Sequence, residues 1–220
     1  MHSPTQTATS VTRQFRPLRS IWLQPGETIS RIAHENPGYL LFVLPIVAGF
    51  WLFPADVLFD DFTETSYGLL LQSLLSFSPL FELIAVFIGA WLVRLTGRWL
   101  GGKGDIESLQ VVFAWSNVPV CVMAVLSTLC IALLMLVGIE PDETPSWGEN
   151  ERFLVIGLVL VGVQVALSVW SLVIFFYGIA AVQGFSLARA VANGVLAWLI
   201  PALTLLALAT TLQFNDYVHW

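Results

Sequence analysis

The stretch GRWLGGKGD, at residues 97–105, combines two patterns that are associated with catalysis. Gly97, four intervening residues and then Gly102-Lys103 reproduce most of a phosphate-binding loop. Residues 102–105 also spell the Gly-x-Gly-Asp pattern of intramembrane aspartyl proteases. The stretch therefore has to be tested both as a nucleotide site and as a protease site.

Neither chemistry has the partner residues that it needs. A phosphate-binding loop joins a strand to a helix and ends in a Ser or Thr hydroxyl, but Gly104 occupies that position and an apolar run precedes the stretch. An aspartyl protease needs two carboxylates that share a proton, and Asp105 has no second aspartate within an apolar run. His2, His34 and His219 also lie outside the apolar runs, which excludes intramembrane Ser-His chemistry. We therefore expect a protein that is not an enzyme, with no catalytic residue, metal site or cofactor.

A glycine turn followed by a helix cap accounts better for the stretch. Gly101, Gly102 and Gly104 allow a tight turn with positive φ angles. Asp105 is then expected to cap the next helix, with Ser108 at its third position.

Polar side chains within the apolar runs are the remaining candidates for function. Glu82 is the only acidic residue there, and five polar residues could join it: Asn117, Gln164, Ser168, Ser171 and Asn193. An intramembrane carboxylate is costly, so it commonly lines a cavity or an ion path. The alternative is a protonated Glu82 that hydrogen-bonds a neighbouring helix and holds the two helices together.

The elements that must position these residues are membrane-spanning helices. The chain is 57% hydrophobic and 11% charged, whereas soluble domains carry about 25% charged residues. Its apolar residues fall into five runs, at 39–53, 68–95, 111–139, 153–181 and 190–212. Runs of 18 or more apolar residues indicate spanning helices, so we predict an all-α membrane protein with five transmembrane helices.

Two details qualify these spans. The first run is short for a bilayer core of about 30 Å, and the crossing within the second run is expected at about 76–95. Pro79, Pro119 and Pro201 lie inside the second, third and fifth runs and are expected to kink their helices.

The distribution of positive charge predicts the orientation. Of the nine Lys and Arg residues, only Arg152 falls on the side opposite the other eight. Because cytoplasmic loops carry the excess of Lys and Arg, the N-terminus is expected in the cytoplasm and the C-terminus outside.

The chain divides into four predicted parts. Residues 1–20 are expected to be a disordered cytoplasmic tail, and 38–212 to be the five-helix membrane domain. Residues 213–220 are expected to be an external tail. Between the first two parts, 21–37 has an apolar side flanked by arginines, which favours a short amphipathic helix on the cytoplasmic membrane surface over a simple linker.

The glycine turn and its surroundings resemble the Yip-domain family, membrane proteins named for interaction with Ypt/Rab GTPases. The matching residues are Gly101, Gly102, Lys103 and Gly104 in the turn, with Trp115 and Pro119 in the following span, and QPGETISRIAHENPGY upstream. The resemblance implies five clustered spans, a cytoplasmic N-terminus and an external C-terminus. The Asp-Leu-Tyr-Gly-Pro motif of eukaryotic members has no match here, which favours the prokaryotic branch and a bacterial cytoplasmic membrane.

Two functions remain open at this stage. The first is a non-enzymatic scaffold that contacts the lipid bilayer and organises membrane-protein partners or copies of itself, without nucleic acid. The second is a component of a small-solute or ion transporter that uses Glu82. The segments GDIESLQVVFAWSNVP and GFSLARAVANGVLAWLIP both lead from a glycine turn into Ala-Trp and a proline, which indicates either an internal repeat or one turn used twice.

Overall fold

The computed structural model describes residues 15–50, 77–136 and 151–218. Every regular element in these ranges is an α-helix, which confirms the predicted all-α class. In chain order they are α1 (Pro17–Ser20), α2 (Pro25–Glu35), α3 (Val43–Gly49), α6 (Ser78–Trp99), α7 (Ile106–Ser116), α8 (Val118–Leu136), α9 (Glu151–Gln183) and α10 (Leu187–Val218).

Four stretches of these helices are long and apolar enough to cross a membrane: Ser78–Trp99, Ile106–Cys130, Gly157–Gln183 and Leu187–Leu208. They correspond to the second to fifth predicted spans. The described part of the first predicted span contains only α3, whose seven residues would extend about 10 Å. Among the described residues, the structure therefore contains four candidate spanning helices rather than five.

The three prolines act differently from one another. Pro119 lies in the first turn of α8, just after a break at Asn117 that separates α7 from α8. Pro201 lies inside the continuous helix α10. Pro79 occupies the first turn of α6, where a missing N–H costs nothing, so the kink predicted at this position is wrong.

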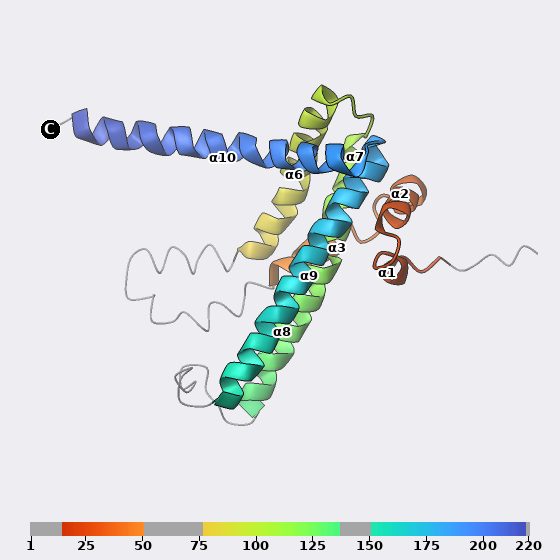
Figure 1. Cartoon of the computed structure of the whole chain (residues 1–220), viewed down its shortest axis with the longest axis vertical. Coiled ribbons are helices and arrows are strands. Elements are labelled where there is room, and N and C mark those ends of the chain that lie inside the picture. The colour runs from red at the N-terminus through yellow and green to blue at the C-terminus, as the bar shows by residue number, and fades with distance from the viewer. Residues whose placement is uncertain (1–14, 51–76, 137–150, 219–220) are drawn as a thin grey trace, which may run out of the picture.

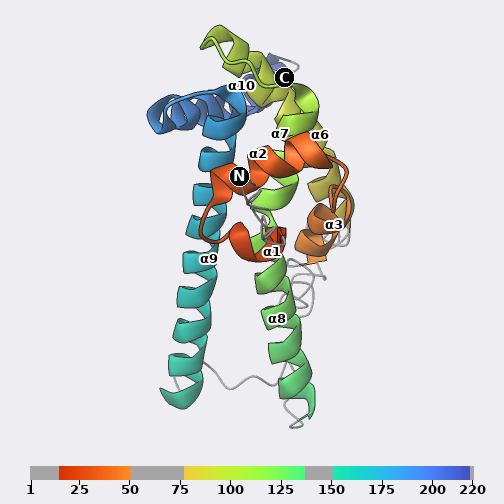
Figure 2. The ribbon, with the colours of Figure 1, turned by 90° about the vertical axis from the view of Figure 1, so that its right-hand side faces the viewer.

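The long helices diverge from a common end. Figures 1 and 2 show α8 and α9 running alongside each other, while α10 leaves the end of α9 at a steep angle and projects away from the other helices. Helix α10 continues to Val218, so the described part of 213–220 is helical. At the other end of the chain, α1 occupies the last residues of the predicted tail 1–20, of which 1–14 lie outside the described residues.

Helix α2 confirms a helix within 21–37, but its apolar side faces protein. Ile29 is fully buried and Ile32 is 3% exposed, because α2 packs across α7 and α9. The expectation that these two side chains face the membrane surface is therefore wrong. An amphipathic pattern requires only an apolar partner, and here the other helices provide it.

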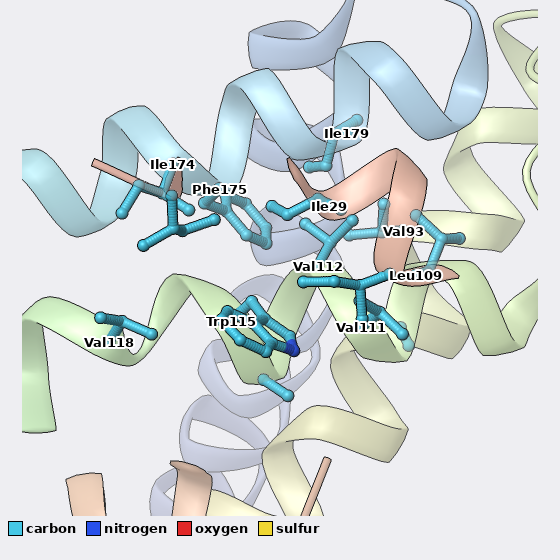
Figure 3. Packing of buried hydrophobic residues seen from close by; sticks show 14 of the residues in the cluster. Ile29, Val93, Leu109, Val111, Val112, Trp115, Val118, Ile174, Phe175 and Ile179 are labelled. Atoms are coloured by element: carbon cyan, nitrogen blue, oxygen red, sulfur yellow. The ribbon is translucent and has the colours of Figure 1, made fainter. Parts of the chain in front are cut away.

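The core lies where α2, α6, α7 and α9 meet. Trp115 of α7 is fully buried, and its indole Nε1 donates a hydrogen bond to Tyr39 O at 3.2 Å. Figure 3 shows Ile29 pointing between the side chains of α7 and α9. Gly178 of α9 faces Ile29 and Val112, whose methyl groups occupy the space of a Cβ. Since lipid is as apolar as these side chains, close packing of this kind holds membrane helices together where the hydrophobic effect does not.

Candidate functional site

The glycine turn ends α6 and begins α7. Gly101 has a φ of +83°, a conformation that favours glycine. The N–H of Gly102 donates to Gly97 O at 2.8 Å, as in the cap that closes many helix ends. Asp105 then accepts a hydrogen bond from the Ser108 N–H at 2.7 Å, which confirms the predicted N-cap.

Gln183, the last residue of α9, fastens this turn to the rest of the protein. Its side chain is 2% exposed, and its Oε1 accepts a hydrogen bond from the Gly104 N–H at 2.9 Å. Its Nε2 donates to Val93 O at 3.4 Å, and its backbone carbonyl accepts from the Lys103 N–H at 3.3 Å. One glutamine thus joins the α6–α7 turn, the body of α6 and the end of α9.

The other glycines are needed for space rather than for φ. A Cβ at Gly97 or Gly102 would overlap the side-chain amide of Gln183. At Gly104 it would lie 3.0 Å from Val182 Cγ1 and 3.1 Å from the amide of Gln183. The prediction of positive φ is therefore confirmed for Gly101 and wrong for Gly102 and Gly104.

Thr96 and Asn193 join α6 to α10 beside Gln183. Both side chains are fully buried, and Thr96 Oγ1 lies 2.6 Å from Asn193 Oδ1 and 3.0 Å from Leu92 O. The hydroxyl has one hydrogen, so it cannot donate to both oxygens. Among the described residues, Asn193 Nδ2 has no hydrogen-bond partner. With the amide O and N of Asn193 exchanged, the nitrogen donates to the Thr96 hydroxyl, and the hydroxyl donates to Leu92 O. Asn193 therefore connects two helices through a hydrogen bond.

The α9–α10 turn repeats the geometry of the α6–α7 turn. Gly184 has a φ of +70°, and the N–H of Phe185 donates to Ala180 O at 2.9 Å. The ring of Phe185 lies next to Gly102, so the two turns are packed against each other. The two similar sequence segments thus begin with the same type of helix cap.

A second site is a cavity of about 500 Å³ between α6, α7, α9 and α10. Among the described residues, four polar side chains line it: Glu82, Ser116, Asn117 and Ser171. The hydroxyl of Ser171 donates to Ser116 O at 2.7 Å, at the break between α7 and α8. The remaining wall is apolar and rich in aromatic rings, among them Phe113 and Phe175, whose centroids are 4.9 Å apart.

No group of three His, Cys, Asp or Glu residues within the described ranges is placed to hold a metal ion. Within these ranges the candidate site therefore consists of one carboxyl group, hydroxyls and amides.

A family model described as the Yip1 domain matches residues 19–209. The chain belongs to the Yip1-domain family. The match covers α2 and all four candidate spanning helices, so this Yip1-domain protein is a multi-pass integral membrane protein. The comparisons with curated proteins and with solved structures find no match to it.

The predicted site residues of this Yip1-domain protein fall into separate places. Glu82 and Asn117 line the cavity, whereas Asn193 belongs to the contact with Thr96. Gln164 lies apart from both, and its Nε2 donates to Ser127 Oγ of α8 at 3.4 Å. Of the predicted polar residues, the structure therefore brings Glu82, Asn117 and Ser171 together in the cavity.

Sequence reasoning missed Thr96, Ser116 and Gln183. Gln183 carried a usable signal, because it is a polar residue directly before a glycine at the end of a long apolar run. Thr96 and Ser116 carried none, since single hydroxyls are common in membrane helices and can bond their own backbone.

Proposed function

We propose that this Yip1-domain protein is a non-enzymatic membrane protein of the prokaryotic type that organises partner proteins, or copies of itself, in the bilayer. The observation that carries this proposal is how little of two spanning helices the protein itself covers. Each candidate span contains an apolar stretch of 18 residues, and only 11% of this stretch is buried in Gly157–Gln183 and 17% in Leu187–Leu208, against 56% in Ile106–Cys130. Most of the surface of α9 and α10 is left for lipid and for other membrane helices.

Helix α9 also offers a place where another helix can approach closely. No atom of the described residues lies within 4 Å of the Cβ position at Gly162, and Ala166, one turn later, is exposed. Small residues four positions apart allow the backbones of membrane helices to come together. Gly178 and Gly194 are not available for this, because Ile29, Val112 and the ring of Phe176 already fill the space beside them.

Photo-crosslinking in native membranes tests the scaffold role. A photoreactive residue at Val165, which is 57% exposed on α9, is expected to form adducts with one or a few defined proteins, identified by mass spectrometry. Gly162→Leu should reduce these adducts, and a photoreactive residue at the buried Ile179 should form none. Adducts with lipid alone at Val165 would refute the scaffold role.

The same arrangement supports an N-terminus in the cytoplasm. Lys103 and Arg189 follow the ends of α6 and α9, and these ends meet through Gln183. Arg152 lies in the first turn of α9, about 45 Å from Gln183 at the other end of this helix, at ~1.5 Å per residue. The positive-inside rule then assigns the glycine turns to the cytoplasmic side, and labelling of Lys103→Cys only from outside intact cells would contradict this.

With the N-terminus and the α6–α7 turn both on the cytoplasmic side, α6 crosses the membrane from outside to inside. One crossing must then precede α6, which makes the total number of crossings odd. Helix α2 lies against the end of α9, near Ala181, on the side of the glycine turns. By Gly49 the chain has reached the opposite end of α6, where Ser78 Oγ donates to Gly49 O at 2.8 Å. The chain therefore passes most of the membrane depth between 36 and 49, which supports a short first crossing as the fifth.

A second candidate function is the transport of a small solute or ion through the cavity. The convergence of Glu82, Asn117 and two serines in one membrane cavity favours it. Proteoliposomes that contain the protein should then show a solute flux that Glu82→Gln abolishes. Equal flux through the variant would exclude this role for Glu82.

A further inference from the structure

The cavity between α6, α7, α9 and α10 has the size and the walls of a site for an organic molecule. Its volume of about 500 Å³ lies in the range of small-molecule pockets, roughly 300–1,000 Å³. Each of the four helices contributes one aromatic side chain or more to the walls, among them Phe81 of α6, Phe113 of α7, Phe175 of α9 and Trp198 of α10. A strongly hydrated solute would lose most of its water here and gain contacts with apolar side chains instead, which costs free energy. The walls therefore select a largely apolar ligand.

Glu82 is the one ionisable side chain among the described residues that line this cavity. It has no hydrogen bond or ion pair with any residue in the described ranges. The closest basic residue along α6, Arg94, lies twelve positions later, about 18 Å away at ~1.5 Å per residue. An intramembrane carboxylate is costly without a partner, and none of the described helices that form the cavity supplies a cation to it.

We propose that this cavity binds a lipophilic organic monocation, with Glu82 as the countercharge and the aromatic rings around the apolar body. The faces of Phe and Trp rings attract cations in addition to the carboxylate. This ligand class also explains why one carboxyl group lies in an otherwise apolar, aromatic wall. The inference uses the same cavity as the transport candidate, but it requires neither transport nor a protein partner.

Other ligand classes fit the described walls less well. A lipophilic anion would meet a carboxyl group and no basic side chain. A metal ion needs several oxygen, nitrogen or sulfur ligands, and no suitable group of three occurs within the described residues. A neutral lipid would gain nothing from Glu82, so its binding would not change when the charge is removed.

Equilibrium binding of tetraphenylphosphonium to the full-length protein in nanodiscs of neutral lipid tests the proposal. We expect saturable binding that Glu82→Gln weakens at least tenfold, while Glu82→Asp retains part of it. Tetraphenylborate, an anion of nearly the same shape, should show no saturable binding. Glu107→Gln, which removes an exposed acid in the first turn of α7, serves as the matched control and should bind like the unchanged protein.

A second variant separates charge from folding. Ala85 lines the cavity and is exposed, so Ala85→Phe should fill the space without disturbing the packed core. It is expected to abolish saturable binding although Glu82 is still present. Binding that survives both Glu82→Gln and Ala85→Phe would overturn the proposal, as would equal binding of the anion. Because binding is measured without flux or partners, a negative result here leaves the scaffold and transport candidates to their own tests.

Discussion

Replacement of Gly49 by alanine is expected to destabilise the protein by about 3 kcal/mol, the upper part of the usual range for overpacking. The added methyl group would lie 2.6 Å from Pro79 N and 2.9 Å from the Ser78 carbonyl carbon. These are backbone atoms, which cannot rotate away as a side chain can. Helix α3 would have to move away from α6 and lose the 2.8 Å hydrogen bond from Ser78 Oγ to Gly49 O. Thermal unfolding in a mild detergent, followed by tryptophan fluorescence, measures the loss.

Gly38→Ala is the matched control for this contact. It lies eleven positions earlier in the same segment, and its nearest neighbour in the structure, Asn36 Oδ1, would be 3.8 Å from the added carbon. Neither glycine has a positive φ, so alanine strains the backbone at neither position. If Gly49→Ala unfolds at the same temperature as Gly38→Ala, the close contact between α3 and α6 is not important for stability.

Replacement of Gln183 by leucine is expected to cost about 2 kcal/mol, because it leaves the Gly104 N–H without its acceptor. Leucine has a similar volume, so the change removes the hydrogen bonds more than the packing. The glycine turn should then separate more easily from the end of α9. Faster hydrogen exchange at Gly104, in addition to a lower unfolding temperature, would show that the effect arises at this turn.

Gln164→Leu provides the comparison on the same helix. Its side chain makes one long hydrogen bond, 3.4 Å to Ser127 Oγ, and no glycine turn depends on it. We expect little loss of stability, since leucine suits an apolar helix surface. Equal destabilisation by the two substitutions would mean that Gln183 has no special role at the turn.

Features that depend on neighbouring residues could be predicted from the sequence. The four long spans follow from runs of apolar residues, because a helix in lipid must satisfy its own backbone groups over about 20 residues. The cap by Asp105 also follows, since its acceptor and the Ser108 N–H are only three residues apart. Gly101 belongs here as well, because the end of a helix itself creates the need for a positive φ.

Features that depend on distant residues could not be predicted. Gly102 and Gly104 are required because Gln183 lies against them, and Gln183 is 79 positions after Gly104. Glu82 and Asn117 share a cavity while Asn193 does not, although nothing in their local sequence distinguishes them.

The amphipathic helix α2 shows most clearly what the sequence can predict and what depends on the tertiary structure. Its sequence determined that Ile29 and Ile32 need an apolar environment, and membrane lipid or protein would both have satisfied that need. Only the tertiary structure decided between them, because α7 and α9 come close enough to cover both side chains. The sequence by itself thus determined which segments enter the bilayer and where they turn. The tertiary structure decided what covers each helix face, because that depends on contacts between residues far apart in the chain.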